Sequence, residues 1–164
     1  MTLPGDRALG EAETVTPEVA GLVELSGVLA SVADRSLQAA PAQVSLAQFR
    51  ALAVLARTEP CSAGELADAL GRIGSTTTRL CDKLLAVGWI TRTHRPADRR
   101  TIELALTRSG RALVEQVLAV RDAELERILT HLPRQSRARL AAVLPSLLSA
   151  ADGVGVPART SWAI

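Results

Sequence analysis

The stretch GRIGSTTTRLCDKLLAVGWITRTHRPADRRTIELALT, residues 71–107, decides the fold that we predict for this chain. A helix is expected after Gly74, because residues suited to burial recur at the i, i+3, i+4 spacing of one helical face. These residues are Thr77, Leu80, Cys81, Leu84 and Leu85. Gly88 favours the end of this helix, since glycine readily takes the left-handed backbone angles found just past a helix C-terminus. The opposite face is polar and is left for solvent or a partner.

Two strands are expected downstream, from Trp89 to Arg95 and from Thr101 to Leu106, because both segments alternate in polarity. Between them, RPADRR (95–100) is too basic and too broken to lie in a core. The pattern therefore predicts a helix followed by a basic β-hairpin.

Two capping boxes upstream predict where the preceding helices begin. In Ser45-Leu46-Ala47-Gln48 and in Ser62-Ala63-Gly64-Glu65, a serine and an acid or amide three residues later can satisfy each other's helix-end donors. The second box opens a short helix that Gly71 ends. A short helix, a glycine-containing turn and a second helix form a helix-turn-helix, and the hairpin makes it a winged one.

Long helices with one apolar face are expected on either side of this unit. The first begins at Thr16-Pro17 and ends near Ala40, the next covers roughly 108–131, and the last opens at Pro133. Pro145 should kink or weaken the last helix, because proline removes a backbone donor. The apolar faces exceed what residues 45–107 need, so we expect them to pack within the chain and across a two-fold axis.

The predicted fold class is mainly α with a small β-hairpin wing. We expect a single domain over 16–151, in which 16–44 and 108–151 form a helical dimerisation region around the lobe 45–107. Residues 1–15 and 152–164 are expected to be tails.

The charge distribution favours a polyanionic partner. Residues 71–111 contain nine Lys and Arg against three acidic residues, a net +6. Because the whole chain is +2, the remainder is −4. A basic segment on a mildly acidic body is the electrostatic footprint of nucleic-acid binding, although a solvated charged face is the alternative.

The polar face of the helix expected after Gly74 and the hairpin that follows it supply the candidate DNA contacts. The major groove admits a helix, and a basic loop beside it can reach the minor groove. The candidates are Ser75, Thr76, Thr78, Arg79 and Lys83 on the helix, and Arg95, Arg99 and Arg100 on the wing. Asp98 is assigned a structural role, since a free carboxylate would repel phosphate.

The remaining reactive side chains form no recognisable chemical site. Cys81 falls on the buried face and is interpreted as core, whereas Cys61 lies in the turn before a helix N-terminus, a location that could lower its thiol pKa. His94 and His131 make no metal-ligand spacing with them. With no nucleophile elbow, phosphate-binding glycine loop or carboxylate pair, the chain is predicted not to be an enzyme and to need no cofactor or metal.

The chain resembles the MarR family of bacterial winged-helix regulators. The resemblance rests on VSLAQFRALAVL, GELADAL, STTTRLCDKLLAVGWITR, PADRR and ELALTRSGRAL, over about 44–113. It implies a transcription regulator that acts as a homodimer, with recognition helices in the major groove and wings in the minor groove of a palindromic DNA operator. It also implies that Asp98 pairs with Arg100 and that Arg99 or Arg95 reaches DNA. Thr77 departs from the family, in which an aliphatic residue is common there, so we expect it to be buried with its hydroxyl bonded back to the helix.

The resemblance further implies a repressor whose DNA binding is weakened by a small-molecule effector. Residues near the first two helices could face such a molecule, but they are equally good solvent-facing residues, so the ligand site is unknown. They are Asp34, Arg35, Gln38, Arg50 and Arg57. Two alternatives stay open: a helical protein-interaction module that kept the fold, and a repressor that senses oxidants through Cys61 or Cys81. With no long apolar run and no signal-peptide region, we expect a cytoplasmic protein that has no contact with a membrane.

Overall fold

The protein is seen here in a computed structural model that describes residues 15–40, 42–71, 74–95 and 98–154. The side chains of Ser75, of Arg95 and of residues 98–101 lie outside that description, as do the predicted tail residues 1–14 and 155–164. The chain divides into two compact units between Ser31 and Val32, a boundary that falls inside the first helix.

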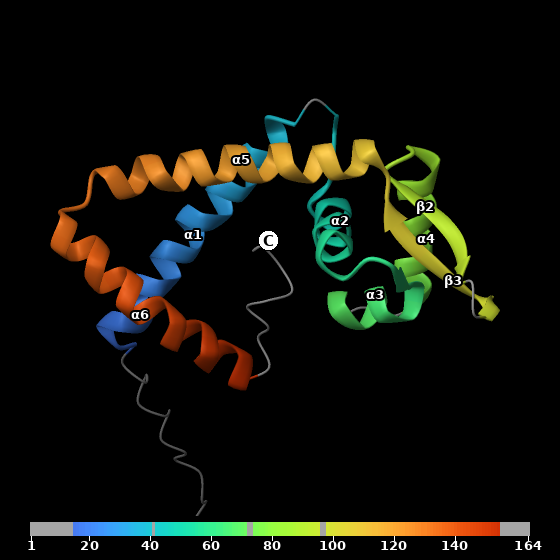
Figure 1. Ribbon diagram of the computed structural model, residues 1–164. Helices are drawn as coiled ribbons and strands as arrows, with labels where there is room; N and C mark the ends of the chain where they lie inside the picture. Colours follow the sequence, from blue (N-terminus) through green and yellow to red (C-terminus); the bar gives the residue numbers. More distant parts are fainter. Residues whose placement is uncertain (1–14, 41, 72–73, 96–97, 155–164) are drawn as a thin grey trace, which may run out of the picture. The chain divides into compact units, whose positions relative to one another are not determined.

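Six helices and three strands follow one another in the described part of the chain. Their bounds are α1 Pro17–Gln38, α2 Leu46–Thr58, β1 Cys61–Ser62, α3 Ala63–Leu70, α4 Gly74–Ala86, β2 Ile90–Arg95, β3 Asp98–Leu106, α5 Arg108–Thr130 and α6 Arg134–Gly153. The predicted class, mainly helical with a small β wing, is confirmed. Figure 1 shows the sheet together with α2, α3 and α4 gathered at one end of α5.

The helix starts follow the local signals of the sequence. Both capping boxes form: Ser45 with Gln48 opens α2, and Ser62 with Glu65 opens α3. Gly71 ends α3 in the left-handed conformation, with a φ of 59°. The N–H groups at the start of a helix and the carbonyl groups at its end have no partners within the helix. The caps supply such partners and so set where each helix begins and ends.

The sheet differs from the predicted two-stranded hairpin. It has three antiparallel strands in the order β1-β3-β2, because Cys61 and Ser62 pair with Leu104 and Glu103. The sequence interpretation placed Cys61 in a turn and missed β1. A strand of two residues shows no alternation, so only its pairing with a segment about forty residues away defines it.

The second strand of the wing also begins earlier than predicted. β3 starts at Asp98 and not at Thr101, so part of RPADRR belongs to the sheet. The register shifts between His94 and Arg95, and Arg95 then pairs with Asp98 across the hairpin. The prediction of a broken loop over 95–100 was therefore wrong for Asp98, Arg99 and Arg100, because the strand extends to Asp98, which pairs with Arg95 of β2.

One hydrophobic core joins α2 to the sheet and to the helices around it. Its largest fully buried side chains include Phe49, Leu52, Leu66, Leu84 and Leu104, from α2, α3, α4 and β3. Val114 and Val117 bring the first half of α5 into the same cluster. Helix α4 and the strands of the wing therefore share one hydrophobic core with α5.

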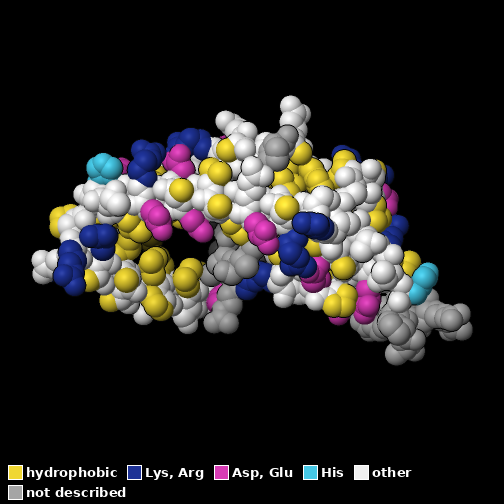
Figure 2. Space-filling model, turned by 45° about the horizontal axis from the view of Figure 1, so that its top comes forward, with side chains coloured by type: hydrophobic (Ala, Val, Ile, Leu, Met, Phe, Trp, Pro, Cys, Tyr) yellow, Lys and Arg dark blue, Asp and Glu magenta, His cyan; other side chains and the backbone are white. Residues whose placement is uncertain are grey.

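The ends of the chain keep large apolar side chains exposed. On α1 these are Val19, Leu22, Val23, Leu25, Val28 and Leu29, and on α6 they are Leu140, Val143, Leu144, Leu147 and Leu148. Figure 2 shows hydrophobic side chains gathered along α6. α6 runs through Pro145 and includes residues 152 and 153, which were predicted to be tail. No helix in the described ranges is long and apolar enough to cross a membrane.

Candidate DNA-binding surface

Helix α4 presents one buried and one exposed face, as its spacing predicts. Leu80, Cys81 and Leu84 are buried against the core, and Thr77 is fully buried with them. The helix ends in two bonds past Ala86: the Gly88 N–H donates to the Leu85 carbonyl and the Trp89 N–H to the Leu84 carbonyl, each at 3.0 Å. Gly88 has a φ of 74°, which glycine takes without steric cost.

The polar face of α4 is open to solvent. Thr76, Thr78, Arg79 and Lys83 are all exposed. The Thr78 hydroxyl donates to the Gly74 carbonyl at 3.0 Å, so only its lone pairs are free to accept from a partner. Ser75 lies on the described backbone of the same helix, but its side chain is outside the described part. The structure therefore places Thr76, Arg79 and Lys83 on one exposed face, each with a hydrogen-bonding group that is available to a partner.

An ion pair joins α4 to the wing. The Arg92 guanidinium on β2 donates to the Asp82 carboxylate at 3.0 Å, and both side chains are largely exposed. Sequence reasoning assigned no role to this pair. Because the two charges pair with each other, neither is offered freely to a ligand, and the contact links the exposed face of α4 to the strand beside it.

The wing backbone is described, but its key side chains are not. Arg95 ends β2, and Asp98, Arg99 and Arg100 begin β3. The side chains of these four residues lie outside the described part of the chain, so the pairing of Asp98 with Arg100 and the reach of the arginines stay predictions. His94 is exposed on β2, in agreement with its interpretation as a wing surface residue.

The start of α5 is bonded to the end of α4. The hydroxyls of Thr107 and Ser109 both donate to the Gly88 carbonyl, at 2.7 and 3.0 Å, and the Thr107 N–H donates to the Trp89 carbonyl at 3.0 Å. The Thr107 hydroxyl also accepts from the Gly110 N–H, which caps α5. α5 therefore holds the turn that directly follows α4. The sequence predicts the cap at Thr107, but not these contacts with residues about twenty positions earlier.

Three further contacts tie α5 to α1 and α2 within the unit that begins at Val32. The buried Arg121 guanidinium donates to the Ser36 hydroxyl at 3.1 Å and lies over the Phe49 ring, 5.2 Å from its centroid. Arg35 forms an ion pair with Glu124 at 2.8 Å. These contacts fix α5 on the body of the lobe, and no sequence pattern indicated them.

Thr77 is buried as predicted, but its hydroxyl has no hydrogen-bond partner. The expectation that the hydroxyl bonds back to the helix was therefore wrong. An unpaired hydroxyl in an apolar site loses its hydration without replacement, which destabilises the folded state.

Replacing Thr77 with valine, which has nearly the same shape, is expected to stabilise the protein by about 1 kcal/mol, because it removes the desolvated hydroxyl. Urea unfolding followed by circular dichroism measures this difference. Thr78→Val on the same helix is the matched control and should give no gain, since the Thr78 hydroxyl is exposed and bonded. A Thr77→Val protein less stable than the parent would contradict the assignment.

Both thiols are buried and carry no sign of activation. Burial raises the pKa of Cys61 and of Cys81 above the ordinary thiol value. The expectation that the helix N-terminus could lower the pKa of Cys61 was wrong, because desolvation by burial, the largest influence on this thiol, raises that pKa. Cys81 lies in the core, as predicted. A raised pKa leaves little thiolate, which is the reactive form.

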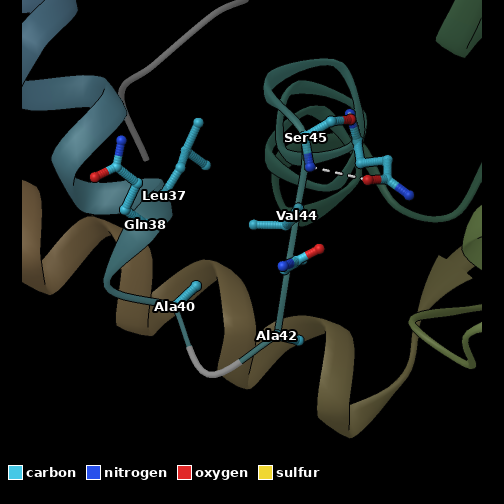
Figure 3. A pocket seen from close by; sticks show the side chains of 8 residues that line it. Leu37, Gln38, Ala40, Ala42, Val44 and Ser45 are labelled. Atoms are coloured by element: carbon cyan, nitrogen blue, oxygen red, sulfur yellow. Dashed lines mark hydrogen bonds between the residues drawn. The ribbon is translucent and has the colours of Figure 1, made fainter.

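A pocket of about 470 Å³ lies between the end of α1 and the start of α2. Figure 3 shows Leu37, Gln38 and Val44 on its wall and the Ser45–Gln48 capping bond at its edge. Of the five effector candidates named from the sequence, Gln38 lines this pocket. Asp34, Arg35, Arg50 and Arg57 are not among its lining residues. Within the described ranges, no group of three or more His, Cys, Asp or Glu could hold a metal ion.

An exposed polar helix, held on a packed body beside a basic β-hairpin, defines a winged helix-turn-helix protein. Residues 44–102 match the MarR family model. HTH-type transcriptional repressor MdtR of Bacillus subtilis is 34% identical over 109 residues, which cover 66% of this chain and 70% of MdtR. The crystal structure of RV1404 from Mycobacterium tuberculosis has a TM-score of 0.77 at 29% identity and covers 86% of this chain and 98% of that one.

Transcriptional regulator Tm0710 from Thermotoga maritima has a TM-score of 0.66 at 30% identity, over 83% of this chain and 94% of its own. The chain belongs to the MarR family. It is a DNA-binding transcriptional regulator and not an enzyme, in agreement with the interpretation of its sequence.

Proposed function

We propose that this protein is a cytoplasmic, homodimeric transcriptional repressor that binds a palindromic DNA operator and is released by a small-molecule effector. The observation that carries the proposal is the exposed polar face of α4, bonded at its end to α5 and placed beside the wing strands. The name of MdtR, a transcriptional repressor, supports repression as the direction of control. The effector is an unidentified small molecule.

The exposed apolar faces of α1 and α6 support a second copy of the chain as partner. α1 carries three acidic residues and one arginine, whereas α6 carries three arginines and one aspartate. Two copies can therefore bury apolar surface and pair opposite charges in the same contact. A two-fold dimer presents two α4 helices to one face of DNA about one helical turn apart, which matches a palindromic site.

The proposed division of labour follows the chain. The lobe 45–107 binds DNA, and the segments 16–44 and 108–151 dimerise. On α4, the candidates Ser75, Thr76, Thr78 and Arg79 face base edges and phosphates in the major groove, with Lys83 on a phosphate. Arg95, Arg99 and Arg100 enter the neighbouring minor groove, and Asp98 shapes the wing. Burial of both thiols does not favour the oxidant-sensing alternative.

In vitro selection of DNA that the parent protein retains, mapped back to the source genome, identifies the operator. We expect a palindrome bound by two chains per duplex. Arg79→Gln should weaken binding to this duplex by about 1–3 kcal/mol and relax its preferred sequence, because Arg79 is exposed on the presented face of α4. Fluorescence anisotropy against the selected and a scrambled duplex measures both effects.

Arg127→Gln provides the matched control, since it removes the same charge from α5 at a site paired within its own helix. It should leave the preferred sequence unchanged. An Arg79→Gln protein that selects the same sequence with the same affinity would contradict the placement of α4 in the major groove. Recovery of no preferred sequence, with a stable protein partner instead, would favour a helical interaction module.

A further inference from the structure

The carboxylate of Glu59 extends the β-ladder beyond the end of its shortest strand. Cys61 pairs with Leu104 and Ser62 with Glu103. In the same antiparallel register, Glu59 stands opposite Leu106. Pro60, which separates Glu59 from Cys61 in the chain, has no N–H to donate to the ladder. The Leu106 N–H donates instead to Oε2 of Glu59, at 2.6 Å, so a side chain supplies the acceptor that a longer strand would have supplied with its backbone.

The other oxygen of the same carboxylate holds α5. Oε1 of Glu59 forms an ion pair with the Arg111 guanidinium in the first turn of α5. The Glu59 side chain is 18% exposed and that of Arg111 48%, so solvent screens this pair less than it screens a fully exposed pair. Glu59 itself is the C-cap of α2. One carboxylate therefore joins the end of α2, the last residue of β3 and the start of α5.

This junction adjoins the bonds that hold α4. Thr107 follows Leu106 directly and donates to Gly88 at the end of α4. Leu106 also pairs with Ile90, the first residue of β2. A shift of Leu106 relative to α5 would therefore displace both Ile90, where the wing begins, and Gly88, in the turn that follows α4.

We propose that Glu59 is a positioning residue for DNA binding, which sets the orientation of the wing and of α4 relative to α5. This inference rests on the proposed use of α4 and the wing to contact DNA. Glu59 touches no DNA in this role. It acts through Leu106 and Arg111, so that the two lobes of a dimer present their α4 helices and wings to DNA at one fixed spacing.

Two substitutions that each remove one charge of the ion pair separate positioning from simple electrostatics. Glu59→Gln makes the protein more positive by one charge, and Arg111→Gln makes it less positive by one. If charge alone mattered, the first variant would bind DNA more tightly and the second more weakly. If orientation matters, both lose specific affinity, because each breaks the same ion pair.

The test titrates the full-length parent, Glu59→Gln, Arg111→Gln and the double variant against the selected operator and a scrambled duplex. We expect each single variant to lose about five- to tenfold in specific affinity, as for a partly buried ion pair. The double variant should be no worse than either single one. On the scrambled duplex, Glu59→Gln should bind at least as tightly as the parent. Glu115→Gln, an exposed change of the same kind on α5, should match the parent on the operator.

Hydrogen exchange at the Leu106 amide adds a readout that does not involve DNA. Glu59→Ala should speed its exchange, whereas Glu59→Gln keeps an acceptor and should protect it. If Glu59→Ala does not fold, Arg111→Gln still tests the proposal, because it leaves the Leu106 bond intact. Opposite effects of Glu59→Gln and Arg111→Gln on the operator, or no effect of either, would overturn the positioning role. Loss of binding in Arg79→Gln alone would leave the proposed function standing, whereas binding unchanged in all three would overturn both.

Discussion

Replacing Arg95, Arg99 and Arg100 together with alanine is expected to weaken operator binding by about a hundredfold or more, at roughly 1 kcal/mol for each lost contact per chain. These arginines belong to the two strands of a hairpin whose backbone pairs Arg95 with Asp98. Each arginine that neutralises a phosphate or enters the minor groove releases bound counterions from DNA.

The salt dependence distinguishes loss of contacts from loss of fold. The slope of log affinity against log salt should fall by about one for each contact removed per chain. Anisotropy titrations over a range of salt concentrations measure it. The matched variant carries lysine at the same three positions, keeps the charge and should recover most of the affinity for scrambled DNA. Operator binding by the alanine variant equal to that of the parent would show that the wing does not contact DNA.

Adding one methyl group at Gly110 is expected to destabilise the protein strongly. A Cβ on Gly110 would lie 2.9 Å from the Trp89 carbonyl carbon and closer still to its oxygen. Both obstructing atoms are backbone, so no change of rotamer relieves the clash. Gly110→Ala should therefore cost about 3 kcal/mol or more of the free energy of unfolding, as α5 is forced away from Trp89 and the Thr107–Trp89 bond breaks.

Gly64→Ala is the matched control for this prediction. Gly64 also lies in the first turn of a helix, and a Cβ there would meet only the Ser62 hydroxyl, at an ordinary 3.8 Å. It should be neutral or stabilise the protein by up to about 1 kcal/mol, because alanine is the better helix former. Urea unfolding of both variants gives the comparison. Equal stability of the two variants would contradict the close approach of α5 to Trp89.

Much of the local structure was predictable because adjacent residues specify it. The serine caps of α2 and α3, the glycine end of α4 and the buried face of α4 all follow from residues no more than about eight positions apart. The candidate DNA contacts on α4 were predictable in the same way, since a residue off the apolar stripe faces outward. Thr76, Arg79 and Lys83 are exposed for that reason.

The junction behind this surface could not be read from the sequence. Glu59 and Leu106 are 47 positions apart, and Gly88 and Thr107 are 19 apart. A glutamate before a proline resembles any polar loop residue until the sheet brings an unpaired N–H to it. β1 was missed on the same grounds, and the early start of β3 was missed because it depends on the pairing of Asp98 with Arg95 across the hairpin.

The sequence by itself therefore determined which segments become helices and strands, which face of α4 stays open and where positive charge gathers. Periodicity, capping and charge depend on a few neighbouring residues, and for this reason they can be recognised in the sequence alone. Only the tertiary structure decided that Cys61 is a buried strand residue, that the Thr77 hydroxyl has no partner and that Glu59 joins α2, β3 and α5. Burial and long-range bonding depend on what the rest of the chain brings to a site, and that becomes defined only when the core has formed.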